Sequence, residues 1–137
     1  MKTILIVDDE PHLRLLYRDT FEEEGYRVVE AEGAEAALAI LETEHVDLAI
    51  LDIRMPGTHG LDLLTHMHSI YPRLPVVLCS GLRSLFRDYA VWNAREQIVG
   101  TFEKPASLEA LVACVNGALR EPPTPASTEA PTPSPVA

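Results

Sequence analysis

Residues 48–57 read LAILDIRMPG, and this stretch decides how the rest of the chain is interpreted. Its first four residues are apolar without alternation, which is typical of a strand buried on both faces of a parallel sheet. Asp52 follows at once, and the Pro56-Gly57 pair then indicates a turn. The stretch therefore predicts a buried strand that delivers a carboxylate to the edge of a sheet.

Four further apolar runs of similar length flank this stretch, at residues 4–7, 26–29, 76–79 and 98–102. Between and after the runs, apolar residues recur at helical spacing, as follows: Leu13, Leu16, Tyr17 and Phe21; Ala34, Ala37, Leu38 and Leu41; Leu63, Met67 and Ile70; Leu82, Leu85, Phe86 and Tyr89; Leu108, Leu111, Val112, Val115 and Leu119. Pro11 suits a first helical turn, and Ser107 is placed to cap the last helix. Strand–helix pairs in this order predict an α/β fold with a doubly wound five-stranded parallel sheet and helices on both faces.

The chain of 137 residues is long enough for one domain. Residues 121–137 hold six of its 11 prolines and almost no large apolar side chains. Such a segment cannot bury enough surface to offset its ordering entropy, so we expect a domain over residues 1–120 and a disordered tail over 121–137. An inert tail is favoured over a docking motif, because the segment lacks aromatic or basic anchors.

The net charge of −10 argues against direct contact with nucleic acid or an anionic membrane. A protein or a cation is therefore the more plausible partner. Cys79 lies in an apolar run and Cys114 in a helical pattern, as expected of buried thiols in a reduced, cytoplasmic protein; a disulfide is the less favoured alternative. We expect no signal peptide and no membrane span.

Polar residues follow four of the five predicted strands: Asp8 and Asp9, Asp52, Ser80 and Gly81, and Lys104 and Pro105. In a doubly wound sheet, the carboxyl ends of the strands meet at one edge, where ligands bind. Carboxylates crowded there repel one another, and Mg²⁺ would remove that cost while accepting a phosphate. A carboxylate can attack phosphorus, the Lys104 ammonium and the Ser80 hydroxyl can hold phosphoryl oxygens, and Gly81 keeps the approach open.

The strings ILIVDDE, LAILDIRMPGTHGLDLL, VVLCSG and FEKP together resemble the signature segments of response-regulator receiver domains, over roughly residues 1 to 120. The resemblance implies a flavodoxin-like (βα)5 fold and a role in a two-component or phosphorelay system. It also implies a role for each residue that matches a motif: Asp52 as phosphoacceptor; Asp9 as a direct Mg²⁺ ligand, helped by Asp8 through water; the backbone carbonyl of Arg54 as a further ligand; Ser80 as a switch hydroxyl; Lys104 as the partner of the phosphoryl group; and a cis bond between Lys104 and Pro105.

The partners implied by this resemblance are a histidine kinase or a phosphotransfer protein that supplies the phosphoryl group. The receiver itself would catalyse only its own phosphorylation and dephosphorylation, so it is not an enzyme in the usual sense. We expect a cytoplasmic signalling switch without an output domain of its own, which acts by binding a protein or by relaying phosphate.

Two features depart from the family pattern. Most relatives have an aromatic residue three positions before the lysine, where this chain has Thr101; the neighbouring Phe102 should point into the core, because alternate strand residues face opposite ways. The stretch from Ser80 to Lys104 is also longer than usual. We therefore expect signalling through the helical segment bounded by Leu82 and Gln97.

Several alternatives remain open. Phe86, Tyr89 and Trp92 either pack in the core or form a partner surface. The Arg54 side chain either faces solvent or screens the phosphoryl group from water. His66 and His68 are two apart on a helix, so unrelated surface groups are favoured over a metal pair.

Two other functions fit the same fold. An unphosphorylated interaction module is disfavoured, because the chain keeps the acidic pair, the acceptor and the lysine. A phosphohydrolase with an Asp nucleophile is disfavoured, because such enzymes usually have an Asp-x-Asp after the first strand and a cap over the site, whereas Asp8 and Asp9 are adjacent here.

Overall fold

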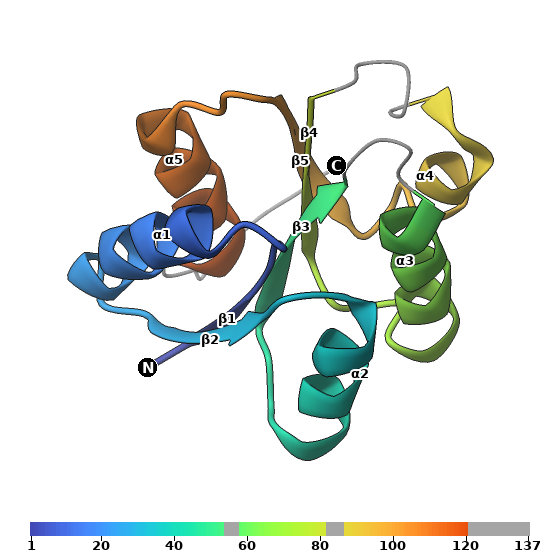
Figure 1. The fold of residues 1–137 in the computed structure, drawn as a ribbon, viewed down its shortest axis with the longest axis horizontal. Helices are drawn as coiled ribbons and strands as arrows, with labels where there is room; N and C mark the ends of the chain where they lie inside the picture. Colours follow the sequence, from blue (N-terminus) through green and yellow to red (C-terminus); the bar gives the residue numbers. More distant parts are fainter. Residues whose placement is uncertain (54–57, 82–86, 121–137) are drawn as a thin grey trace, which may run out of the picture.

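The structure is a computed structural model that describes residues 1–53, 58–81 and 87–120. Strands and helices alternate along the chain (Figure 1). The strands are β1 (Thr3–Val7), β2 (Arg27–Ala31), β3 (Leu48–Ile53), β4 (Val76–Ser80) and β5 (Ile98–Glu103). The helices are α1 (Pro11–Glu23), α2 (Ala34–Thr43), α3 (Thr58–Ile70), α4 (Tyr89–Asn93) and α5 (Leu108–Leu119). None of the helices in the described residues is long and apolar enough to cross a membrane.

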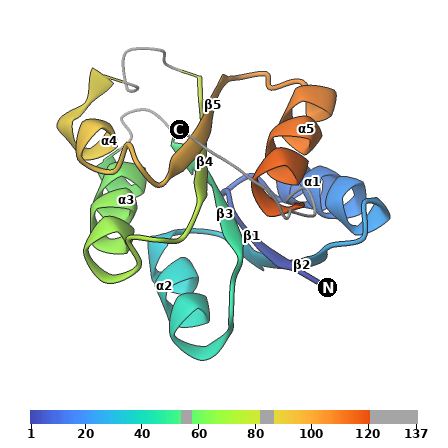
Figure 2. The same cartoon turned by 180° about the vertical axis from the view of Figure 1, so that it is seen from behind.

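The strands form one parallel sheet in the order β2-β1-β3-β4-β5, which confirms the predicted fold class. The order reverses direction at β1, so the helices are distributed over both faces. Figures 1 and 2 show α1 and α5 on one face and α2, α3 and α4 on the other. The carboxyl ends of β1, β3 and β4 lie side by side, because Val7 pairs with Leu51 and Ile53 with Ser80.

Two hydrophobic clusters hold these layers together, one on each face of the sheet. Under α1 and α5, the buried residues include Phe21, Leu111 and Val115, packed on β1, β3 and β4. On the other face, Leu41, Leu64 and Met67 contribute from α2 and α3. Strands such as β1 and β4 are buried along their whole length, which explains why they read as continuous apolar runs.

Local signals at the helix ends agree with the sequence. Pro11 begins α1, and the Glu10 side chain accepts a hydrogen bond from the His12 amide at 3.1 Å. Ser107 caps α5 by accepting from the Ala110 amide at 3.2 Å.

Gly60 lets α3 approach β3, since an added Cβ would lie 3.3 Å from the Ile53 Cα. The helix therefore sits closely against the strand that carries Asp52.

The predicted helix from residue 82 to 97 is wrong in its last part. Residues 82–86, and with them Leu82, Leu85 and Phe86, lie outside the described residues. The helix found here covers Tyr89–Asn93 and is capped by the Asp88 carboxylate, which accepts from the Ala90 amide at 2.8 Å. Gln97 lies in the turn before β5, where its buried amide donates to the backbone oxygens of Tyr71 and Leu74 at 3.0 and 2.8 Å. These hydrogen bonds stabilise a turn rather than a continued helix.

Three residues of the predicted apolar stripes are exposed instead. Tyr89 is 83% exposed, Ile70 55% and Leu16 44%. On α1, Tyr17 and Phe21 already occupy the face toward the sheet, so the neighbouring Leu16 points away from it.

Both cysteines are free thiols, Cys79 buried and Cys114 half-buried. Residues 121–137 lie outside the described part, so the expected tail stays a prediction.

Candidate functional site

The residues expected at the sheet edge come from four strand ends. Asp8 follows β1 and Lys104 follows β5, as predicted, whereas Asp52 and Ser80 are still part of β3 and β4. The ladder continues through them because backbone pairing, Asp52 with Cys79 and Ile53 with Ser80, does not depend on side-chain polarity. The Lys104 amide donates to the Ser80 carbonyl at 2.8 Å, which joins the lysine to the end of β4.

Carboxylates gather at this edge. Oxygens of Asp8, Asp9 and Asp52 all lie within 4.8 Å of one another. The Asp8 and Asp52 side chains are 1% and 2% exposed, whereas Asp9 is exposed to solvent. We call Asp8, Asp9, Asp52 and Lys104 the acidic edge.

Lys104 supplies positive charge to this cluster. Its Nζ lies 2.8 Å from Asp52 Oδ1 and 3.7 Å from Asp8 Oδ2. The lysine side chain is 20% exposed, so it is more accessible to solvent than the two carboxylates that it contacts. A buried carboxylate pair with one close ammonium keeps net negative charge, which favours a further cation.

The pKa of Asp8 is raised to about 6, mainly by burial and further by the negative charge of Asp52, against a hydrogen bond from the Glu10 amide that lowers it. Burial also raises the pKa of the Cys79 thiol to about 12, with Asp52 adding to the effect. The Cys79 thiol, on the strand next to the one that carries Asp52, is therefore protonated and unreactive at neutral pH.

The donor set at the acidic edge fits Mg²⁺. Three carboxylates within reach of one ion are hard oxygen ligands, and the exposure of Asp9 leaves one side open to water, as this ion requires. Burial and the charge of Asp52 both raise the pKa of Asp8, so a nearby cation would favour its ionised form. The further ligand expected from the Arg54 carbonyl lies outside the described residues.

The loop from β1 to α1 is held by contacts that the sequence did not predict. The Asp8 amide donates to the Ala31 carbonyl at 3.1 Å, and the Glu10 amide donates to Asp8 Oδ1 at 2.8 Å. Arg14 of α1 donates through Nη1 to the Asp8 carbonyl at 2.6 Å. The sequence signal for Arg14 is weak, a basic residue early in the helix that follows an acidic pair.

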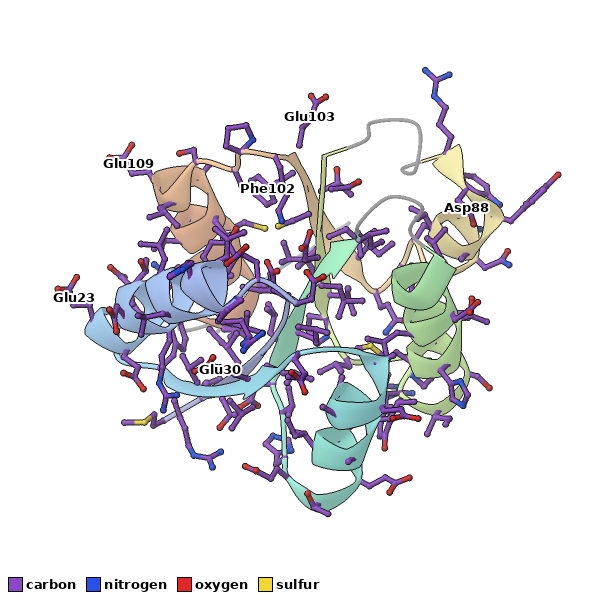
Figure 3. All side chains as sticks on the ribbon, viewed as in Figure 1. Glu23, Glu30, Asp88, Phe102, Glu103 and Glu109 are labelled. Atoms are coloured by element: carbon purple, nitrogen blue, oxygen red, sulfur yellow. The ribbon has the colours of Figure 1, made fainter. Side chains whose placement is uncertain are left out.

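Thr101, which departs from the family pattern, and its neighbour Phe102 lie on opposite sides of β5. Phe102 packs against the cluster under α5, as predicted, and Figure 3 shows it between β5 and α5 while Glu103 points outward. Thr101 is exposed and faces α4. Together with Tyr89, Trp92 and Arg95 it lines a cavity of about 610 Å³. We call these four residues the α4 surface.

The remaining predicted residues are placed as follows. The Lys104–Pro105 bond is cis, as expected. Gly81 is exposed, and an added Cβ would meet nothing within 4 Å, so the described residues give no steric reason for glycine here. His68 Nδ1 lies 2.9 Å from the Gln97 side-chain oxygen, an interaction that does not involve His66.

Comparison with known proteins gives one consistent family. The profile described as the response regulator receiver domain matches residues 4–116. The transcriptional regulatory protein GlrR of Escherichia coli is 33% identical over 118 residues, which is 86% of this chain and 26% of that protein. The sporulation initiation phosphotransferase F of Bacillus subtilis is 35% identical over 82 residues, 60% of this chain and 66% of that protein.

Among solved structures, the response regulator TrrA of Thermotoga maritima, in complex with Mg²⁺ and BeF, has a TM-score of 0.77 and 32% identity. The match covers 87% of this chain and all of that one. A CheY-like receiver domain protein of Methanospirillum hungatei has a TM-score of 0.79 and 31% identity over 88% of this chain and 95% of that one. The chain thus spans about a quarter of a curated relative such as GlrR but nearly the whole of these receiver domains.

Proposed function

Because the chain belongs to the response regulator receiver domain family, we propose that it accepts a phosphoryl group on Asp52 in a Mg²⁺-dependent reaction. One observation carries the proposal: the ammonium of Lys104 lies 2.8 Å from Asp52 Oδ1, inside a cluster of three carboxylates at the end of the central strand. A surface acid would have neither this burial nor this counter-charge. Membership of the receiver domain family agrees with a role in phosphoacceptor signalling.

In the transfer, an Asp52 carboxylate oxygen forms a bond to phosphorus while the bond from phosphorus to the donor breaks, and the donor group leaves with its electron pair. Before the transfer, the Lys104 ammonium pairs with the Asp52 carboxylate. After the transfer, it would pair with an oxygen of the phosphoryl group instead. The Ser80 hydroxyl, at the end of the neighbouring strand, donates to another phosphoryl oxygen. The same groups serve the slow hydrolysis of the product, so the domain catalyses only its own phosphorylation and dephosphorylation.

Asp9, Asp52 and, through water, Asp8 would hold the metal ion, together with the Arg54 carbonyl. When bound, Mg²⁺ supplies positive charge that offsets the carboxylates and the phosphoryl oxygens. The TrrA structure, whose complex contains Mg²⁺ and BeF, supports this assignment by similarity.

A histidine kinase or a phosphotransfer protein is the proposed source of the phosphoryl group, and a protein the proposed target. The relatives named above are a transcriptional regulatory protein and a phosphotransferase, so they support a signalling role and do not specify the target. The net charge of −10 argues against nucleic acid or an anionic membrane as the direct partner of this chain.

The phosphoacceptor assignment is tested by incubating the protein with acetyl phosphate and Mg²⁺ and measuring its intact mass. We expect one added phosphoryl group on the parent and none on Asp52→Asn. Asp62→Asn is the matched control, since Asp62 is an exposed acid on α3. Equal labelling of Asp52→Asn and the parent would overturn the assignment, and no labelling of the parent would favour an unphosphorylated interaction module.

The proposed output region is the segment bounded by Leu82 and Gln97, of which the structure describes residues 87–97. Tyr89 and Trp92 are 83% and 60% exposed there, an apolar area available to a protein partner. Thr101 cannot swing as an aromatic ring does, so the signal would pass from Ser80 along the chain to α4. Hydrogen exchange with and without beryllofluoride tests this: we expect the largest change in residues 82–97 and little in 19–44. A change confined to Thr101 and Phe102 would contradict it.

A further inference from the structure

We infer that Arg14 is a positioning residue for the acidic edge: it holds the peptide between Asp8 and Asp9 so that Asp9 is oriented to bind the metal ion. This inference rests on the proposed Mg²⁺ site. It concerns a residue of α1 that acts through the backbone, by its hydrogen bond to the Asp8 carbonyl.

The contacts of Arg14 are directed at two elements. Nη1 donates to the Asp8 carbonyl at 2.6 Å, and Nε donates to Glu30 Oε1 at 3.1 Å. The two paired side chains are only 18% and 24% exposed, so solvent screens this pair less than a surface pair. Glu30 lies on β2 beneath α1 (Figure 3). Arg14 thus fastens the β1–α1 loop to the neighbouring strand.

The Asp8 carbonyl belongs to the peptide group that joins Asp8 to Asp9, so a strong hydrogen bond to it restricts the rotation of that peptide plane. The other side of Asp8 is already fixed, since its amide donates to the Ala31 carbonyl at 3.1 Å and its Oδ1 accepts from the Glu10 amide at 2.8 Å. Arg14 adds a restraint on the carbonyl side of Asp8. Its loss would loosen the peptide from which the Asp9 side chain starts.

A role through charge and a role in positioning Asp9 predict opposite changes in Mg²⁺ affinity when Arg14 is replaced. If Arg14 acted only through its charge, its removal would strengthen Mg²⁺ binding, because like charges repel. If it positions Asp9, its removal weakens binding, as loss of a residue that orients a metal ligand does. The sign of the change in affinity therefore separates the two roles.

Arg18 provides a matched control on the same helix. It pairs with the same Glu30, Nη1 to Oε2 at 2.6 Å, and with Glu22, Nε to Oε2 at 3.2 Å. Neither of these contacts involves the β1–α1 loop. Replacing Arg18 thus removes the same charge and disturbs the same partner, while the hydrogen bond to Asp8 remains.

The experiment is calorimetric titration of the metal-free proteins with MgCl₂. Arg14→Met keeps most of the apolar stem, and we expect its affinity to fall about tenfold. Arg18→Met should stay within about twofold of the parent, because its partly exposed ion pairs do not contact the β1–α1 loop. Arg14→Lys keeps one donor and should lie between the parent and Arg14→Met. An unchanged or higher affinity for Arg14→Met, or equal losses for both methionine variants, would overturn the inference.

A second measurement needs no metal ion. In amide NMR spectra of the metal-free protein, Arg14→Met should shift the Asp8, Asp9 and Glu10 signals, and Arg18→Met should leave them in place; absence of that shift would also overturn the inference. If Arg14→Met does not fold, Arg14→Gln takes its place with the same expected results. Failure of the parent to accept a phosphoryl group would reject the proposed function, whereas the Mg²⁺ affinities would still decide the role of Arg14.

Discussion

The acidic edge and the α4 surface stand close to the same strands but are built differently. At the acidic edge, Asp8 and Asp52 are almost fully buried and are held by strand ends and a close lysine. At the α4 surface, Tyr89 and Trp92 are exposed, on a helix of only five residues. The comparison teaches that the proposed phosphoryl chemistry lies where the sheet fixes the geometry, at a cost in charge repulsion. The proposed recognition surface instead consists of exposed side chains on a short helix.

The largest effect that this comparison predicts is on Lys104. Lys104→Ala removes the ammonium 2.8 Å from Asp52 and leaves crowded carboxylates behind. In EDTA at neutral pH, we expect the free energy of unfolding to fall by about 2–3 kcal/mol, near the lower end for a broken buried pair because the lysine is partly exposed. Urea denaturation measures it.

The double variant Lys104→Ala, Asp52→Asn provides the control. It removes both charges, so we expect it to recover a large part of the lost stability, a coupling that additive, unrelated sites would not show. If the double variant is as unstable as the sum of the two single losses, the 2.8 Å contact does not control the stability of the acidic edge.

The same contrast explains what the sequence could predict. The strands are nearly continuous apolar runs, and polar residues at their ends can be assigned to one edge once the strand order is known; Asp8, Asp52 and Lys104 were found in this way. Periodicity placed Tyr89 in a buried stripe, but a cap at Asp88 starts a short helix there and turns the ring to solvent.

Contacts between distant segments were not predictable. The bond from Arg14 to the Asp8 carbonyl depends on how α1 lies over the loop, and Gln97 is buried because Tyr71 and Leu74 present their carbonyls to it. Such arrangements follow from tertiary packing, and no local spacing rule encodes them.

The next prediction concerns pH and the raised pKa of Asp8, about 6. Between the ordinary value of 3.8 and about 6, the folded protein binds this proton more tightly than the unfolded chain does, so stability falls as pH rises through that window. In EDTA, we expect a loss of about 1–2 kcal/mol from this group, after allowance for screening by solvent. Urea denaturation at several pH values measures it.

Asp8→Asn is the control for that pH dependence, because the amide does not titrate. We expect the variant to lack this part of the decline in stability. Asp47 gives the opposite trend, a stability that rises with pH, because the hydrogen bond from the Thr3 amide helps to lower its pKa. That trend should remain in both proteins. Identical pH profiles for the parent and Asp8→Asn would show that ionisation of Asp8 does not cause the decline in stability. Added Mg²⁺ should reduce the decline in the parent, since it binds the ionised form.

The smallest effect is expected at the α4 surface. Tyr89→Ala should change the free energy of unfolding by less than about 0.5 kcal/mol, because the ring is largely exposed. Trp92→Ala should cost slightly more, up to about 1 kcal/mol, since Arg95 stacks over the indole at 4.1 Å. Val91→Ala, one residue away but buried, is the matched control and should cost about 2 kcal/mol. Chemical denaturation of the three variants measures these differences. Losses at Tyr89 or Trp92 as large as the loss at Val91 would mean that the aromatic rings support the fold, and the α4 surface would then no longer stand apart from the acidic edge as a region available for recognition.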